Sequence, residues 1–166
     1  MENKKVEKDF IVMIGMSLSG KTYHVDLNYL PGYQLLSSKH YKQAFQTTKI
    51  SDPNIIYAAM ELTARSHMIK GLPIIVDESN LDVDSLFLWK SIAREFGYNI
   101  KGVLIDTPLD VCTARLKYLL KGEAISEEMH NKLTSEYEKV EELKILLKMK
   151  YQNILDNVSF INYDGG

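Results

Sequence analysis

The residues best suited to chemistry lie between positions 15 and 22, where the sequence reads GMSLSGKT. This segment fits the pattern G-x-x-x-x-G-K-[ST], which describes a phosphate-binding P-loop. In such a loop the glycines permit dihedrals that turn backbone N–H groups inward around a phosphate. The lysine reaches the β- and γ-phosphates and takes part in catalysis, and the Ser/Thr hydroxyl ligates Mg²⁺. The pattern therefore predicts that ATP or another nucleoside triphosphate, with Mg²⁺, binds to Gly15, Ser17, Ser19, Gly20, Lys21 and Thr22.

The flanks of this segment have the composition that a P-loop needs. Residues 10–14 are an apolar run that ends at a glycine, which is typical of a short buried strand. A helix is expected from Gly20 to about Leu30, where Pro31 and Gly32 stop it. The positive end of that helix would add to the attraction for phosphate.

A second candidate group follows the apolar residues Ile74–Val76. Asp77 and Glu78 come at the carboxyl end of this predicted strand, where an open α/β sheet places its ligand groups. In a P-loop protein such an acid holds Mg²⁺ or its water shell. The sequence does not choose between the two acids.

The elements that must position these residues alternate between strand and helix. Strands are expected near residues 10–14, 34–36, 73–76, 103–105 and 158–161. Helices are expected near residues 20–30, 39–47, 53–70, 83–95, 108–119 and 127–151. Asp52, Asp82 and Ser126 fit helix N-caps. We therefore predict a three-layer α/β fold with a mainly parallel sheet of about five strands.

Two helices carry specific expectations. Residues 108–119 should bury an apolar face made of Leu109, Cys112, Leu116 and Leu119. The charged run from Glu136 to Lys150 is expected to form the solvated face of a helix.

Composition places the chain among ordinary globular proteins. Its 166 residues suit one domain, and its net charge of -2 provides no general attraction to nucleic acid, although a local basic groove would suffice to bind one. The single cysteine excludes an internal disulfide, and no apolar run has the length of a membrane span. Residues 1–9 are charged and lack the apolar core of a signal peptide. We expect a cytoplasmic protein, and the sequence does not indicate an oligomeric state.

The chain resembles the phage-type polynucleotide 5′-kinases, a group of small P-loop kinases. The resemblance is carried by the P-loop, by residues 76–81 (VDESNL) and by the stretch from Trp89 to Glu138, and it covers most of the chain. It implies one kinase domain over residues 1–166 that transfers the γ-phosphate of ATP to a 5′-hydroxyl of DNA or RNA. It also implies a helical lid at about 115–126, in which Arg115, also catalytic, and Lys121 contact the nucleotide.

The family's substrate segment is altered in this chain. The segment aligns with residues 35–43, and the arginine that grips the substrate phosphate is replaced by Lys42, which keeps the charge but not the bidentate geometry. The aspartate that serves as general base is replaced by Lys39, whose ammonium group cannot accept a proton at neutral pH. His40, or one of Asp77 and Glu78, is left as a candidate base. Otherwise the acceptor differs or activity has been lost.

Two alternatives to a polynucleotide kinase follow from this change. One is a kinase of a small acceptor, such as a nucleoside, a nucleotide or a modified base. The other is a non-catalytic ATP-binding module. A basic groove around Lys39, Lys42 and Lys49 would favour a polynucleotide, whereas a closed pocket would favour a small acceptor.

Overall fold

The computed structural model describes residues 8–46, 52–150 and 152–162, and within these residues it has five strands and six helices. The strands are β1 (Asp9–Ile14), β2 (Gln34–Leu36), β3 (Ile74–Val76), β4 (Asn99–Asp106) and β5 (Asn157–Asn162). The helices are α1 (Lys21–Asn28), α2 (Ser38–Gln46), α3 (Pro53–Ile69), α4 (Val83–Glu95), α5 (Leu109–Leu119) and α6 (Glu127–Leu147). Strand and helix alternate along the chain almost throughout, as the sequence predicts.

The five strands form one parallel sheet in the order β2-β3-β1-β4-β5. Val12 pairs with Val76, and Ile14 pairs with Leu104, so the strands end at nearly the same level. Residues that directly follow β1, β2, β3 and β4 therefore meet along one edge of the sheet. That edge is where ligands bind in open α/β sheets.

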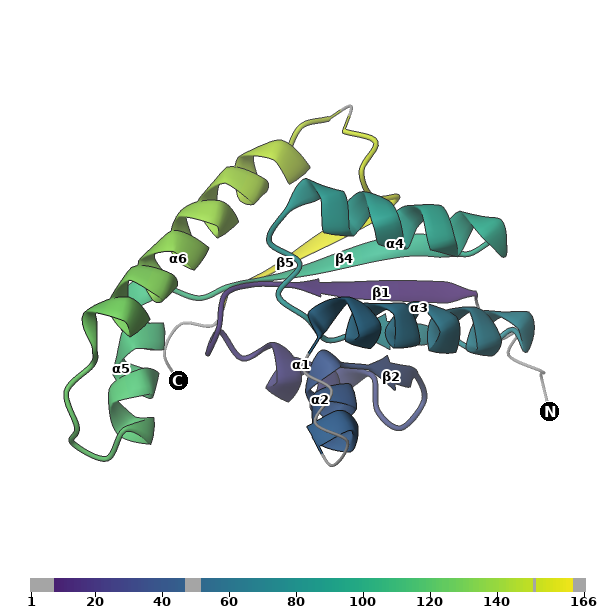
Figure 1. The fold of residues 1–166 in the computed structure, drawn as a ribbon. Helices are drawn as coiled ribbons and strands as arrows, with labels where there is room; N and C mark the ends of the chain where they lie inside the picture. Colours follow the sequence, from purple (N-terminus) through teal and green to yellow (C-terminus); the bar gives the residue numbers. More distant parts are fainter. Residues whose placement is uncertain (1–7, 47–51, 151, 163–166) are drawn as a thin grey trace.

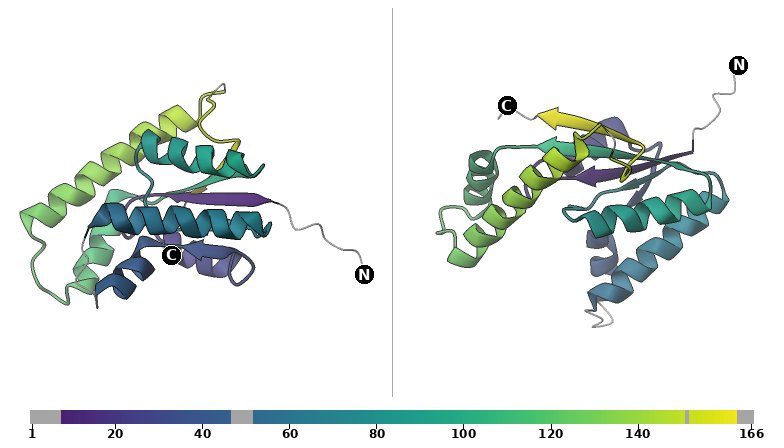
Figure 2. Two further views of the ribbon diagram at one scale, coloured as in Figure 1. Left: turned by 45° about the vertical axis from the view of Figure 1, so that its right-hand side comes forward. Right: turned by 90° about the horizontal axis from the view of Figure 1, so that it is seen from above.

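Helices cover both faces of the sheet, which confirms the predicted three-layer α/β fold. On one face, α3, α4 and α6 pack on the even-numbered residues of β1, from Phe10 to Ile14, in one apolar cluster (Figures 1 and 2). On the other face, Val25 of α1 packs on Ile11 and Met13 of the same strand. This division follows from the two-residue period of a strand.

Three helices begin at the predicted N-caps. The carboxylate of Asp52 accepts a hydrogen bond from the N–H of Asn54, and that of Asp82 accepts one from the N–H of Ser85, both over 2.9 Å. The Ser126 hydroxyl accepts one from the N–H of Met129 over 3.2 Å. Each cap satisfies an N–H group that the first helical turn leaves without a partner.

Several predicted boundaries and one predicted face are wrong. β4 begins at Asn99, four residues before its predicted start, because Lys101 and Gly102 interrupt the apolar pattern; Lys101 pairs with Asp9, and Gly102 lies under Leu155. Leu119 is 61% exposed rather than buried, since the last turn of α5 lies beyond the sheet (Figure 1). α1 ends at Asn28 and α6 at Leu147, each earlier than predicted.

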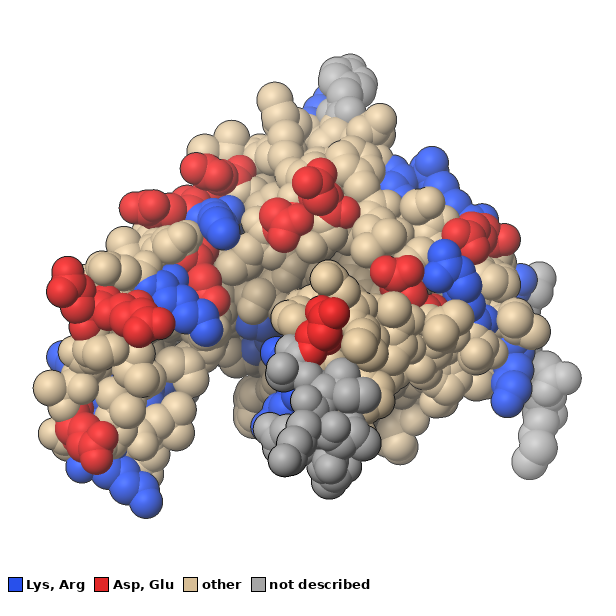
Figure 3. Space-filling model, viewed as in Figure 1, with Lys and Arg blue, Asp and Glu red and all other residues tan. Residues whose placement is uncertain are grey.

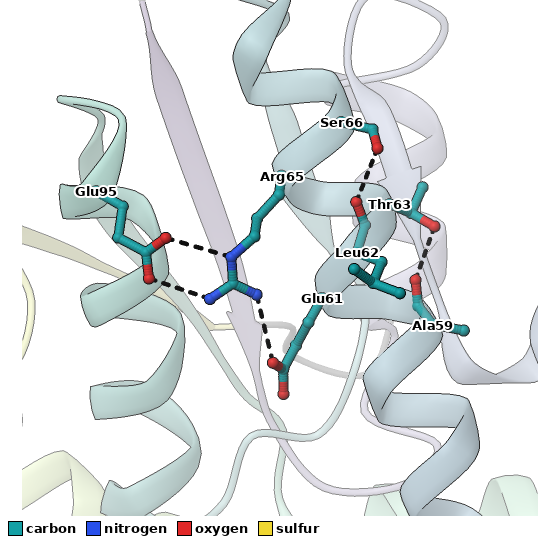
Figure 4. Close-up of polar contacts among 7 residues, drawn as sticks. All are labelled: Ala59, Glu61, Leu62, Thr63, Arg65, Ser66 and Glu95. Carbon is teal, nitrogen blue, oxygen red and sulfur yellow. Dashed lines mark hydrogen bonds and ion pairs between the residues drawn. The ribbon is translucent and has the colours of Figure 1, made fainter.

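α3 and α4 are also tied together by ion pairs. Arg65 of α3 donates through Nε and Nη2 to the two carboxylate oxygens of Glu95 on α4, over 3.2 and 3.0 Å (Figure 4). Its Nη1 lies 3.5 Å from Glu61, one turn earlier on α3. These contacts hold the two helices side by side.

α5, residues 120–126 and α6 form an antiparallel pair of helices that projects past the carboxyl edge of the sheet, and we call this unit the arm (Figure 1). Figure 3 shows a hollow between the arm and the side that bears α2 and α3, with basic side chains visible at its depth. Within the part of the chain that the structure describes, no helix combines the length and apolarity that crossing a membrane would require.

Candidate active site

The P-loop segment folds as a tight loop between β1 and α1. The N–H of Gly15 donates to the carbonyl of Ser79 over 3.1 Å, which anchors the loop to the end of β3. Leu18 and Gly20 have φ of 65° and 100°, so the loop alternates between right- and left-handed backbone. A Cβ at Gly15 would lie 2.9 Å from the Ser19 Oγ and 3.1 Å from the Ile105 carbonyl oxygen, which explains the glycine there.

The N-terminal end of α1 presents N–H groups at this loop. Its N-cap is Gly20, and no side chain accepts a hydrogen bond from the first turn. Backbone N–H groups at an uncapped helix start form an anion site. Two other loop N–H groups have protein acceptors, since Ser17 donates to Glu136 and Ser19 donates to the Met16 carbonyl.

Lys21 lies folded over the loop. Its Nζ donates to the carbonyl oxygens of Gly15 and Met16 over 2.9 and 2.8 Å. Burial lowers the pKa of Lys21, while the negative charges of Asp77 and Glu136 oppose that shift. An ammonium group that is partly withdrawn from solvent at a phosphate loop is suited to attract the phosphates of a nucleotide.

The two acids after β3 have different partners. The Thr22 hydroxyl donates to the Asp77 carboxylate over 2.7 Å, beside the P-loop. The Glu78 carboxylate accepts a hydrogen bond from the backbone N–H of Ser38, at the start of α2. The structure thus brings Thr22 and Asp77 together, and it places Glu78 between the P-loop and α2.

Arg115 lies against the P-loop, and its predicted contact with the nucleotide stays a prediction. Its Nη1 donates to the Leu18 carbonyl over 2.8 Å. A hollow of about 690 Å³ opens beside it, lined by Leu18, Ser19, Gly20, Lys21, Thr22, Tyr23 and Arg115. Lys121 lines a separate hollow with Lys117, Tyr118, Leu119 and Gly122, so its role at the nucleotide stays a prediction.

Glu136 is a site residue that the sequence did not reveal. Its carboxylate accepts hydrogen bonds from the backbone N–H and the hydroxyl of Ser17, over 2.9 and 3.0 Å. Lys144 of the same helix lies 2.8 Å from Asp106 and is largely buried. The interpretation of the run from Glu136 to Lys150 as a solvated face is therefore wrong for these two residues, because α6 crosses the carboxyl edge of the sheet.

α2 carries the residues that the resemblance assigns to the acceptor. The Tyr41 hydroxyl donates to the Thr63 hydroxyl over 2.6 Å, which fixes the face of α2 that packs on α3. Successive helical residues turn by about 100°, so His40 and Lys42 lie on opposite flanks of that face, and Lys39 points away from it. All three side chains are exposed. Lys49, the third cation of the expected groove, lies outside the described residues.

A third hollow lies beside Glu78 and Ser79. It measures about 550 Å³ and lies between α3 and the β3–α4 connection. It is lined by Asn54, Tyr57, Ala58, Glu61, Glu78, Ser79, Asn80, Asp82, Ser85, Leu88 and Trp89. No sequence pattern predicted this hollow, because its walls come together only through packing of the two helices.

The parallel sheet, the P-loop and the acid after β3 define a kinase-like nucleotide-binding domain of the P-loop type. The chain belongs to the AAA domain family, which matches residues 10–139. No curated protein matches the sequence.

Solved structures share the fold at low sequence identity. The Pnkp1/Rnl/Hen1 RNA repair complex contains a chain that is 15% identical, with a TM-score of 0.66 over 86% of this chain and 48% of that one, so the present chain spans about half of it. Kti12 of Chaetomium thermophilum, solved with ADP-AlF3, is 13% identical, with a TM-score of 0.64 over 93% of this chain and 89% of that one. The tunicamycin resistance protein of Deinococcus radiodurans is 17% identical, with a TM-score of 0.58 over 93% and 85%.

Proposed function

We propose that the protein transfers the γ-phosphate of ATP, bound with Mg²⁺, to a hydroxyl group of an acceptor. One observation carries this proposal: the Thr22 hydroxyl and the Asp77 carboxylate lie 2.7 Å apart, next to Lys21 of the P-loop. A hydroxyl and a carboxylate at this place in a P-loop are the oxygen donors that Mg²⁺ prefers.

Each group of residues has a role in this proposal. The N–H groups of Gly20, Lys21 and Thr22 hold the β-phosphate, and the Lys21 ammonium neutralises charge on the transferred group. Thr22 and Asp77 would hold Mg²⁺, which would supply positive charge to stabilise the phosphates during transfer. Asp77 suits the metal better than Glu78 does, because Glu78 is already bonded to α2.

Residues at about 115–126 of the arm serve as the lid, and residues 1–166 act as one kinase domain. Arg115 supports this role because its Nη1 donates to the Leu18 carbonyl of the P-loop. A guanidinium at this place stabilises charge on the transferred group in the transition state.

Two acceptors are compatible with this site. A polynucleotide 5′ end is favoured by the sequence resemblance and by the exposed Lys39 and Lys42 of α2, which could bind backbone phosphates. A small hydroxyl compound is favoured by the bounded hollow beside Glu78. Kinase activity itself does not depend on this choice.

The test is a transfer assay with ATP labelled at the γ-phosphate. Acceptors are 5′-hydroxyl DNA and RNA oligonucleotides, nucleosides, nucleotides and small sugars, and each is assayed with wild type and with Lys21→Ala. We expect wild type to label at least one acceptor and Lys21→Ala to label none. Binding of ATP without transfer to any acceptor would instead indicate a non-catalytic module.

A further inference from the structure

The hollow between α3 and α4 reaches the phosphate loop at its floor. Ser79 lines the hollow, and its carbonyl accepts the hydrogen bond from the N–H of Gly15, the first residue of the P-loop. Glu78 also lines it and directly follows Asp77, which accepts the hydrogen bond from Thr22 of the P-loop. A molecule in this space would therefore lie next to the phosphate-binding loop.

We infer that this hollow binds the phosphate acceptor, and that the acceptor is a small hydroxyl compound with a protonated amine. The inference rests on the proposed kinase function, because it assigns the second substrate of that reaction. A volume of about 550 Å³ lies within the range of small-molecule sites and has no room for a run of nucleotides.

Charge decides the class of acceptor. Glu61, Glu78 and Asp82 line the hollow, and no Lys or Arg is among the described residues that line it. Arg65 is 3.5 Å from Glu61 but is held mainly by Glu95, outside the hollow (Figure 4). Acidic side chains also gather at the start of α4 in Figure 3. A phosphodiester would be repelled here, whereas an ammonium group would be attracted.

Tyr57 gives the hollow a surface suited to the same group. Its side chain is 46% exposed although it lines the hollow, so its ring is accessible to a ligand. Glu78 and Asp82 line the same hollow as Tyr57, and their charges add to the effect of burial in raising the pKa of Tyr57. An aromatic ring beside two carboxylates is a favourable place for an organic cation.

The reaction at this site is a direct displacement. The acceptor oxygen forms a bond to the γ-phosphorus, and the bond from that phosphorus to the oxygen bridging the β- and γ-phosphates breaks, releasing ADP. The hydroxyl proton passes to the Glu78 carboxylate oxygen that is not bonded to Ser38, and then to solvent. Glu78 is the residue that both lines the hollow and acts electrostatically on Lys21.

The experiment compares acceptors that differ by one amine. The pairs are glucosamine with glucose and galactosamine with galactose, and 5′-hydroxyl DNA and RNA oligonucleotides are assayed beside them. We expect kcat/KM for an amine to exceed that for its neutral partner by about 10- to 100-fold, the effect of one charged hydrogen bond. Equal values within each pair would overturn the inference.

Other outcomes separate this inference from the kinase function itself. Transfer mainly to the oligonucleotides, or mainly to neutral compounds, would leave the kinase function standing and overturn the inference. Transfer to no acceptor at all would overturn both.

Variants test whether the hollow produces the preference. Glu61→Gln should reduce the amine-to-neutral ratio of kcat/KM by about 10-fold. Glu95→Gln is the matched control, because Glu95 also binds Arg65 but does not line the hollow. This variant should leave the ratio unchanged. An equal loss in both variants would mean that Glu61 acts only through Arg65, and would contradict the inference.

A second pair of variants does not depend on the Arg65 contacts. Tyr57→Leu should reduce the amine-to-neutral ratio by about 3- to 10-fold, because the aromatic ring is lost, and Tyr57→Phe should keep most of it. Because the Tyr57 side chain is exposed, neither substitution should destabilise the fold. An unchanged ratio in Tyr57→Leu would remove this ring from the acceptor site and overturn the assignment of the hollow.

Discussion

The hydroxyl of Thr22 donates a hydrogen bond to the carboxylate of Asp77 over 2.7 Å, which joins the start of α1 to the end of β3. The two residues are 55 positions apart in the chain, and the parallel pairing of β1 with β3 brings them together. The contact selects Asp77 over Glu78 as the partner of Thr22, a choice that the sequence left open. It also leads to a prediction about the metal.

Loss of either partner should raise the Mg²⁺ requirement. In Thr22→Val and Asp77→Asn, the Mg²⁺ concentration for half-maximal transfer should rise by about 10-fold or more, because an oxygen ligand or its orientation is lost. Glu78→Gln should change this concentration much less, since Glu78 is bonded to Ser38. The readout is a Mg²⁺ titration of the transfer rate and of the thermal shift with ATP. If Glu78→Gln had the largest effect, the metal assignment would be reversed.

Lys21→Met should reduce transfer by about 10²-fold or more without loss of the fold, because Lys21 acts on charge in the transition state. Its stability without nucleotide should also depend less on pH. Burial lowers the pKa of Lys21 in the folded protein below its ordinary value of 10.5. At pH values between the folded-state pKa and 10.5, the unfolded chain therefore binds more protons than the folded one. Stability from this group therefore rises with pH across that window.

Denaturant unfolding from pH 7 to 10, with and without the substitution, measures this effect. Wild type should gain stability over this range relative to Lys21→Met. If the free energy of unfolding had the same pH dependence in both proteins, the folded state would not disfavour the charged form of Lys21. The Lys21 ammonium group would then gain no stabilisation from a bound phosphate on this account.

Local patterns of the sequence predicted the P-loop, the strands beside it and three helix caps, because each depends on residues a few positions apart. Glu136 was missed because its partner Ser17 lies 119 positions away, and a glutamate within a charged helix usually faces solvent. The hollow between α3 and α4 was missed for a related reason. Tyr57 and Glu61 meet Asp82 and Leu88 only after both helices pack on the sheet.

Arg115→Ala should lower kcat by about 10²-fold or more while the affinity for ATP changes by less than about 10-fold, because a lid cation acts on charge that develops during transfer. Arg115→Lys should recover part of kcat, since it keeps the charge but not the planar fork. Steady-state kinetics and equilibrium ATP binding give the two quantities. A change in affinity alone would make Arg115 a ground-state ligand.

Glu136→Gln should bind ATP more tightly, by about fivefold, because a negative charge is removed from beside the P-loop. The N–H and hydroxyl of Ser17 donate to Glu136. A bound phosphate would therefore have to share these donors with Glu136 or displace its carboxylate. Glu138→Gln is the control, an exposed residue two positions along the same helix. Calorimetric titration with ATP measures both. Weaker binding in Glu136→Gln would mean that the carboxylate orders the loop for phosphate.

The last prediction concerns the general base. If Glu78 takes the hydroxyl proton, Glu78→Gln should lower kcat by about 10²- to 10⁴-fold. His40→Ala should then have little effect, since His40 does not line the hollow beside Glu78. If His40 is the base, its removal should eliminate activity at higher pH, and Glu78→Gln should retain the profile.

Lys39→Asp tests a third case, in which the geometry of a polynucleotide kinase is kept and only its general base has been lost. Transfer to a 5′-hydroxyl oligonucleotide should then rise in Lys39→Asp, by up to the same factor. Loss of activity in Lys39→Asp would mean instead that Lys39 contacts phosphate. Profiles of kcat from pH 5 to 9, for wild type and these three variants with one amine acceptor and one oligonucleotide, distinguish the cases.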